Sequence, residues 1–220
     1  VVVRGVACEV LQPERVSLPL PWNRANAIET EGARLYIPKG VMFDNACLDI
    51  VYDDSCTLRG SCFSTDEDVV FRSGAKLSLK PGSDVEGVGR EKLYICRRTA
   101  GELSYVGGKY ADGVVTATIP SQGVYEIAVD TVAPVLAPVG EAAWEQNGRV
   151  VFRLDDMETK IASFRGTLNG NFVLFKYNRK ERRLTFDFKQ ENIKSGTHKL
   201  RVEAVDVCGN RTVFEKDLKF

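Results

Sequence analysis

The sequence predicts an all-β protein built as two tandem β-sandwich domains, the second of them immunoglobulin- or fibronectin-like. Three observations lead to this prediction. Short runs of alternating apolar and polar residues dominate the chain, turn residues separate these runs at intervals of about 8–12 residues, and no stretch shows the periodicity of an amphipathic helix of three turns. This pattern is typical of antiparallel sheets, in which each strand buries one face.

Turn signals place several strands along the chain. Residues 99–101 separate two β-rich runs and predict a hairpin. Asn169-Gly170 is the clearest signal, because both central residues of a type I′ turn need positive φ. After it, the run "THKLRVEAVD" alternates apolar residues 200, 202 and 204 with charged ones, so we expect a half-buried strand there.

The domain boundary is predicted at residues 129–138. Pro134 and Pro138 each lack an N–H donor and favour an extended residue before them, which suits a linker or a first edge strand. We therefore expect one domain at 1–130 and an immunoglobulin-like domain at 131–220. Residues 1–29 are proline-rich and expected to be loop-like, as a linker or the tail of a domain upstream.

The balance of charge excludes one class of partner. Lys plus Arg and Asp plus Glu both number 30, so the formal net charge is zero, whereas nucleic-acid binders carry a basic excess that neutralises phosphates. No apolar run approaches the roughly 18–20 residues of a membrane helix. The chain begins with valines and no Met, so we expect a processed product or an excised fragment.

The six cysteines include no Cys-x-x-Cys pair, which argues against a zinc ribbon. Cys56 and Cys62 are close enough in sequence to close a small loop, and they form the candidate disulfide in an exported protein. The alternative is that several cysteines are buried thiols, which pack as small apolar groups.

Longer stretches carry a family resemblance. "DTVAPVL" followed by "AVDVCGN" resembles the opening and closing motifs of a bacterial immunoglobulin-like repeat. Residues 33–45, 103–135 and 162–188 together resemble the C-terminal, non-catalytic region of lysostaphin-type peptidoglycan endopeptidases of Gram-negative anaerobes. The turn at residues 157–161 departs from that pattern, which has Ser-Gly-Ile there, while the flanking strands match.

The resemblance implies an accessory region without its catalytic domain. Catalytic domains of that family bind zinc through His-x-x-x-Asp and His-x-His motifs, and this chain has one histidine, His198. A hydrolytic zinc site needs three protein ligands and an open position, so no catalytic residue transfers here and zinc is expected only in the missing domain. His198 also lacks a Gly-x-Ser-x-Gly partner motif and reads as a histidine at the start of a strand.

Acidic residues at strand ends offer a candidate calcium site. If the strand ends meet the linker, four carboxylates converge, and calcium takes about six or more oxygen ligands. Capping of an Asx-type turn at each position is the alternative, since no loop has the spacing of a dedicated calcium site. The candidate ligands are Asp130, Asp155, Asp156 and Asp206.

A basic run and several aromatic residues are candidate contacts for an anionic or glycan ligand. The cations are Lys176, Arg179, Lys180, Arg182 and Arg183. They suit an anionic cell-wall polymer or lipid head group, or form the solvated tip of a hairpin that keeps an edge from pairing. Most aromatics are expected in the core or at an interface, including Trp22, Trp144, Tyr105 and Tyr110. Phe172 and Tyr177 have opposite parity on one expected strand, so one of them should be exposed.

These observations bear on three functions. The first is an extracytoplasmic accessory region of a peptidoglycan zinc metallopeptidase, which positions its own upstream catalytic domain, contacts the wall, or both. The second is a glycan- or protein-binding surface module with no enzyme attached. An intrinsic hydrolase is disfavoured because the sequence has no nucleophile–base or metal constellation.

Overall fold

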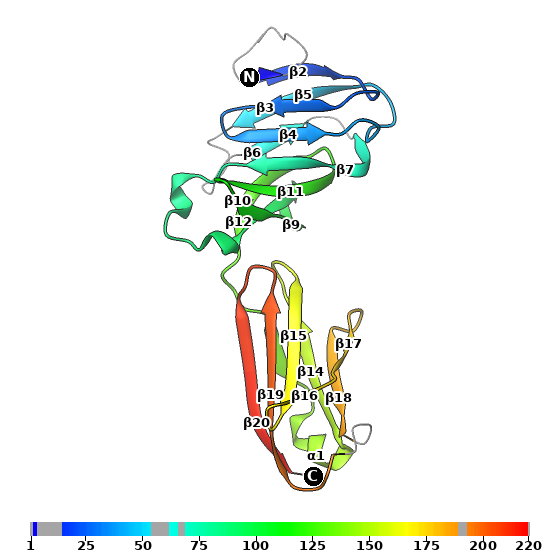
Figure 1. The fold of residues 1–220 in the computed structure, drawn as a ribbon, viewed down its shortest axis with the longest axis vertical. Helices are drawn as coiled ribbons and strands as arrows, with labels where there is room; N and C mark the ends of the chain where they lie inside the picture. Colours follow the sequence, from blue (N-terminus) through cyan, green and yellow to red (C-terminus); the bar gives the residue numbers. More distant parts are fainter. Residues whose placement is uncertain (1, 4–14, 54–61, 66–68, 189–192, 220) are drawn as a thin grey trace. The chain divides into compact units, whose positions relative to one another are not determined.

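The computed structural model describes residues 2–3, 15–53, 62–65, 69–188 and 193–219. The chain forms two compact units, Val1–Asp130 and Thr131–Phe220. Both are built from antiparallel strands in paired sheets, so the predicted all-β sandwich architecture is confirmed (Figure 1). No helix in the described part of the chain is long and apolar enough to cross a membrane.

The first unit consists of two six-stranded sheets. One has the order β1-β3-β4-β7-β11-β10, with strands Val2–Val3, Asn26–Glu29, Ala33–Ile37, Val70–Leu79, Val114–Ser121 and Lys109–Ala111. The other has the order β2-β5-β6-β12-β8-β9, with strands Arg15–Leu20, Ala46–Asp53, Cys62–Thr65, Val124–Val129, Leu93–Thr99 and Glu102–Gly107. Two short 3-10 helices, Ser83–Val85 and Arg90–Lys92, connect β7 to β8.

Two-residue turns with positive φ close the hairpins of both units. Ala100 and Gly101 join β8 to β9 with φ of 50° and 86°. Asn169 and Gly170 join β15 to β16 with φ of 52° and 81°, so the hairpin predicted at this dipeptide is confirmed. The twist of such turns matches that of the strands they connect, which explains why a short local signal was sufficient.

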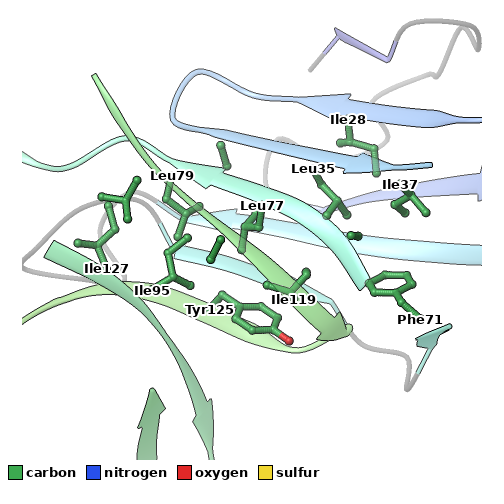
Figure 2. Close-up of a cluster of buried hydrophobic side chains, with 14 of the residues drawn as sticks. Ile28, Leu35, Ile37, Phe71, Leu77, Leu79, Ile95, Ile119, Tyr125 and Ile127 are labelled. Carbon is green, nitrogen blue, oxygen red and sulfur yellow. The ribbon is translucent and has the colours of Figure 1, made fainter. Parts of the chain in front are cut away.

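The core of the first unit lies between its two sheets. It is made of the inward-facing apolar residues of both, for example Leu35 and Leu77 from one sheet and Ile95 and Ile127 from the other (Figure 2). Alternation along β4 shows the cause, because every second residue from Ala33 to Ile37 is buried. Each buried leucine or isoleucine stabilises the fold by roughly 1.5–3 kcal/mol relative to its exposed state.

Strands β8 and β12 do not alternate, because they are covered on both faces. Residues 93–96 and 125–128 are all buried, and these include a carboxylate, Glu126. Arg98 on the neighbouring strand pairs with Glu126 at 2.6 Å between Nη2 and Oε1. A strand that buries both faces normally reads as a continuous apolar run, so the paired charge marks a departure from the usual pattern.

The second unit has the strand arrangement of an immunoglobulin-like sandwich. One sheet has the order β13-β14-β18-β17, with strands Val135–Pro138, Arg149–Asp155, Arg183–Asp187 and Lys176–Asn178. The other has the order β16-β15-β19-β20, with strands Asn171–Val173, Ile161–Leu168, Thr197–Asp206 and Arg211–Lys219. In chain order these correspond to an A-B-E-D sheet facing a C-F-G sheet that gains one extra strand after C.

A short helical segment that the sequence analysis did not predict closes one end of this unit. The 3-10 helix Glu141–Ala143 and the α-helix Trp144–Asn147 lie between β13 and β14. Trp144 is buried, its indole N–H donates to the Val139 carbonyl at 2.8 Å, and its ring makes an edge contact with Phe152. The segment is too short for sequence periodicity to reveal, and this core contact holds it in place.

Two expectations about backbone course are wrong. Residues 15–20 and 26–29, expected to be loop-like, are strands β2 and β3, which pair with β5 and β4 and bury Leu18 and Ile28. Phe172 and Tyr177 do not share one strand, because the chain leaves β16 after Val173 and enters β17 in the opposite sheet. In both places the partner strand decided the outcome, and single-sequence alternation does not contain that partner.

Candidate functional site

The basic run folds as an edge hairpin of the second unit, and we call residues 176–183 the basic hairpin (Figure 1). Asn178 organises its turn: the side-chain Oδ1 accepts the backbone N–H groups of Lys180 at 3.1 Å and Glu181 at 3.2 Å. Arg182 adopts φ of 53°, which brings the chain back into β18. The turn is therefore built from local Asx chemistry, as the asparagine suggested.

Four of the five cations of the basic hairpin fall into two groups, and the fifth, Lys176, is exposed at the start of β17. Arg179, Lys180 and Arg183 are exposed, and within the described chain no ion pair joins them to a carboxylate. Arg182 instead turns back onto the sandwich, where its Nη1 lies 2.5 Å from Asp155 Oδ2. Three outward cations remain to form a positive surface at a sheet edge, where charge also prevents pairing with other chains.

Asp155 anchors the base of the basic hairpin. Its carboxylate is 7% exposed and accepts from Arg182 and, at 3.2 Å, from Arg153 Nη2. Tyr177 adds a second anchor, because its hydroxyl donates to the Leu154 carbonyl at 3.3 Å and its ring packs edge-on against Phe164. Asp155 therefore holds two arginines: Arg153, two residues earlier on β14, and Arg182, in the turn before β18. Sequence spacing carries no signal for the second of these pairs.

A cavity of about 330 Å³ lies beside the basic hairpin, and its lining carries both signs of charge. Arg179, Arg182 and Lys160 line it together with Asp155 and Asp156. Because the opposed charges lie within the same small space, the cavity does not select strongly for an anion. The outer cations of the hairpin are the better candidates for a contact with an extended polyanion.

The other acidic candidates of the second unit act as turn caps. Asp156 Oδ1 accepts the backbone N–H groups of Glu158 at 3.0 Å and Thr159 at 2.7 Å. The buried Asp206 accepts the N–H groups of Cys208 and Asn210, both at 2.8 Å, and the Asn210 side-chain amide at 2.8 Å. These are the contacts of Asx-type turns, the alternative to calcium binding that the sequence offers for these residues.

Two of the predicted calcium ligands also approach each other within the second unit. One carboxylate oxygen of Asp156 lies within 4.8 Å of one of Asp206, whereas Asp155 is engaged by arginines. Asp130 belongs to the first unit, where it is buried and its backbone N–H donates to the Lys92 carbonyl at 3.0 Å. The calcium site stays a prediction.

The aromatic candidates separate into buried and exposed residues. Trp144 belongs to the core of the second unit, as expected for most of the set, and Tyr177 is half-buried. Phe172 is 59% exposed and lies under the Arg165 guanidinium, 5.7 Å from its carbon to the ring centre. Trp22 of the first unit is 44% exposed. One member of the Phe172 and Tyr177 pair is thus exposed, although for a different reason than strand parity.

His198 is tied into a turn contact. Its Nδ1 lies 3.0 Å from the Asn169 side-chain nitrogen and accepts that N–H, so Nε2 carries the proton and donates to the Lys194 carbonyl at 2.8 Å. Both ring nitrogens therefore hold the turn before β19 in place. The candidate disulfide cannot be placed, because Cys56 and the side chain of Cys62 lie outside the described residues.

Comparisons with known proteins give one family match. A sequence model of the Zu5-like domain matches residues 17–130, just over half of the chain and nearly all of the first unit. No curated protein matches the chain. Among solved structures, the spore cortex lytic enzyme SleM of Clostridium perfringens matches with 13% sequence identity and a TM-score of 0.27. That match covers 59% of this chain and 38% of the enzyme, so the chain spans well under half of its length.

Proposed function

The chain belongs to the Zu5-like domain family through residues 17–130, and from this premise we propose that it is a non-catalytic, extracytoplasmic accessory region that contacts the anionic cell wall through the basic hairpin. One observation carries the proposal: Arg179, Lys180 and Arg183 are exposed on the basic hairpin with no carboxylate of the described chain paired to them. Peptidoglycan offers repeated carboxylates, and several cations on one edge bind such a polymer by summed charge.

The resemblance of residues 33–45, 103–135 and 162–188 to the non-catalytic region of lysostaphin-type endopeptidases supports the cell-wall setting. In this proposal the zinc-dependent peptidase activity belongs to an upstream domain, and this chain positions that domain on its substrate. The gene segment that encodes the residues before Val1 tests this part. It should encode His-x-x-x-Asp and a later His-x-His, and a segment without them would contradict the peptidase assignment.

Wall binding is tested by sedimentation with purified peptidoglycan sacculi. At low salt the 220-residue chain should sediment with the sacculi, and the triple variant Arg179→Gln, Lys180→Gln, Arg183→Gln should lose at least about tenfold in affinity. Binding of the unchanged chain should also weaken steeply with added salt, because exposed charges are screened within a Debye length of about 10 Å at 0.1 M.

A matched control separates local charge from net charge. Arg34→Gln, Lys76→Gln and Lys109→Gln remove three exposed cations from the first unit and should leave sedimentation nearly unchanged. Equal losses for both triple variants would show that net charge alone is responsible and would overturn the role of the hairpin. Failure of the unchanged chain to sediment at low salt would remove wall binding and favour the alternative, a surface module that binds another protein.

A further inference from the structure

The first unit contains a cavity of about 540 Å³ that no sequence motif indicated. Its walls come from both sheets: residues 71–74 of β7 with Thr118 and Pro120 of β11 on one side, and Arg97 of β8 with residues 104–106 of β9 on the other. We call it the arginine cavity, because Arg72 and Arg97 are its charged residues.

An irregularity in β7 forms one wall. Ala75 pairs with Ile119 and Val70 with Ser121, so residues 71–74 lie opposite Pro120 alone. Gly74 has φ of 83°, and a Cβ there would lie 2.5 Å from the Thr118 methyl and 3.1 Å from the Ile119 carbonyl oxygen. Pro120 lacks an N–H, so it leaves no ladder donor unsatisfied where pairing is lost.

A second irregularity, in β9, forms the facing wall. Ile95 pairs with Gly107 and Cys96 with Tyr105, which leaves Val106 as an extra residue on β9. Bulges bend a strand, change the direction of nearby side chains and are common beside functional sites. Here one bulge in each sheet lines the same cavity, so the sandwich is opened at this point from both sides.

Arg97 lines the cavity, and it also holds a buried hydrogen-bond donor that has no partner among the described residues. Its Nη2 donates to the Gln122 carbonyl at 3.1 Å, but its Nε is buried and makes no hydrogen bond. Gly123 leaves room for this guanidinium, since a Cβ there would lie 2.8 Å from Nε. A buried donor without an acceptor costs roughly 1–3 kcal/mol, so the guanidinium of this lining residue is incompletely satisfied within the described chain.

Arg72 adds a second cation at the same cavity. Its side chain is exposed, its guanidinium carbon lies 5.0 Å from the ring centre of Phe43, and no ion pair with another described residue holds it. No acidic residue lines the cavity, whereas the hydroxyl-bearing residues Ser73, Ser104 and Thr118 do. The lining therefore offers cationic and neutral donors without a competing carboxylate.

We propose that the arginine cavity binds a carboxylate, presented by the end of a peptide or by an acidic sugar. The carboxylate pairs with the guanidinium groups of Arg97 and Arg72, because guanidinium donors match the planar geometry of a carboxylate. Hydroxyls and the rings of Phe71 and Tyr105 contact the rest of the ligand. The site goes beyond the proposed function, since it lies in the first unit and does not depend on the basic hairpin.

The binding test uses the 220-residue chain labelled with ¹⁵N and four small probes. N-acetylmuramic acid represents an acidic sugar and N-acetyl-D-alanyl-D-alanine a peptide end. N-acetylglucosamine and the amide of the dipeptide lack the carboxylate. At least one carboxylate probe should shift the amide resonances of residues 72–75 and 104–106, and its neutral counterpart should not. Which probe binds identifies the source of the carboxylate.

Three variants locate the ligand. Arg72→Gln and Arg97→Gln should each weaken binding about tenfold, whereas Arg34→Gln, an exposed arginine on β4 of the same unit, should not. Because Arg97 also bonds to the Gln122 carbonyl, its loss can disturb the fold. Ser73→Trp therefore serves as an independent variant that fills the cavity while both arginines are kept, and it should abolish binding while amide exchange of β7 and β11 stays native.

Three results would overturn the proposal. The first is that neither carboxylate probe shifts these resonances at millimolar concentration. The second is that binding persists in Ser73→Trp. The third is inorganic phosphate binding as tightly as the carboxylates, which would show a general anion site. Because sacculus sedimentation reports on the basic hairpin and these titrations report on residues 72–75 and 104–106, failure of one proposal is distinguishable from failure of the other.

Discussion

Strands β12 and β19 end with nearly the same letters but have different surroundings. The first ends Glu126-Ile-Ala-Val and is followed by Asp130, and the second ends Glu203-Ala-Val-Asp. The side chain of Glu126 is 6% exposed and that of Glu203 is 27% exposed. Both glutamates pair with arginine, yet β12 is covered on both faces while β19 alternates and presents its charged face to solvent.

The difference shows that similar local sequence does not determine how much a charged side chain contributes to the stability of the fold. A buried carboxylate depends on its partner, because desolvation must be offset by close charge-assisted hydrogen bonds. The glutamate of β19 sits in an exposed ladder with Arg201 and Arg211, where water and salt screen each pair. Four measurements test this contrast.

Cys96, which faces Glu126 across β8 and β12, should show the largest effect. Burial, reinforced by the charge of Glu126, raises the pKa of the Cys96 thiol to about 12 from an ordinary 9.0. At pH 8 its thiolate fraction is lower by about a thousandfold, and alkylation by iodoacetamide should slow by about that factor relative to the unfolded chain. The rate should still rise tenfold per pH unit above pH 9. Peptide mass mapping measures the alkylation rate of Cys96. Equal rates in the folded and unfolded chain would show that water reaches the face of β8 and β12 that carries Cys96.

Asp206→Ala should destabilise the second unit by about 3 kcal/mol, because three buried N–H donors lose their acceptor. Denaturant unfolding followed by the fluorescence of the buried Trp144, with Trp22→Phe as a common background, measures the loss. Asp217→Ala, which removes an exposed carboxylate from β20, is the matched control and should change stability little. Similar losses in the two variants would mean that the turn cap contributes no more than surface charge.

Arg98→Gln and Arg211→Gln compare the two glutamates directly. Loss of Arg98 leaves Glu126 buried without this partner and should cost about 2 kcal/mol in the first unit, whereas loss of Arg211 should cost less than about 1 kcal/mol in the second. Amide hydrogen exchange of β12 and β19 reports each unit separately. If Arg211→Gln costs more stability than Arg98→Gln, burial of the carboxylate does not explain the difference between the two strands.

The smallest effect is expected in the exposed ladder itself. Hydrogen bonds from Arg201, and then Lys199, lower the pKa of Glu215 below its ordinary 4.5. A lowered folded-state pKa means that this contribution is fully present above pH 4.5 and lost as the pH falls through the folded value. The difference between Arg201→Gln and the unchanged chain should therefore be small at pH 7 and disappear at pH 2 or in 1 M salt. A difference that survives 1 M salt would mean that the pair is not screened.

Much of the fold and little of the candidate binding chemistry follows from the sequence. The hairpin at Asn169 and Gly170 was predicted because its φ requirement is local. Strands β2 and β3 were missed because prolines and short length hide a strand whose pairing is supplied from elsewhere in the chain. The basic hairpin was found as a run of charge, but only contact with Asp155 separates Arg182 from the three outward cations.

By itself, then, the sequence determined the all-β class, the turn dipeptides and the acidic and basic runs, because each depends on residues within a few positions of one another. Tertiary structure alone decided three other features: the cover over both faces of β12, the pairing of Asp155, and the arginine cavity. Gly74 and Pro120 lie 46 positions apart in the sequence numbering, and they mark a cavity only once β7 and β11 are paired out of register. Register and burial are properties of a strand's neighbours, and a single chain read in order does not contain them.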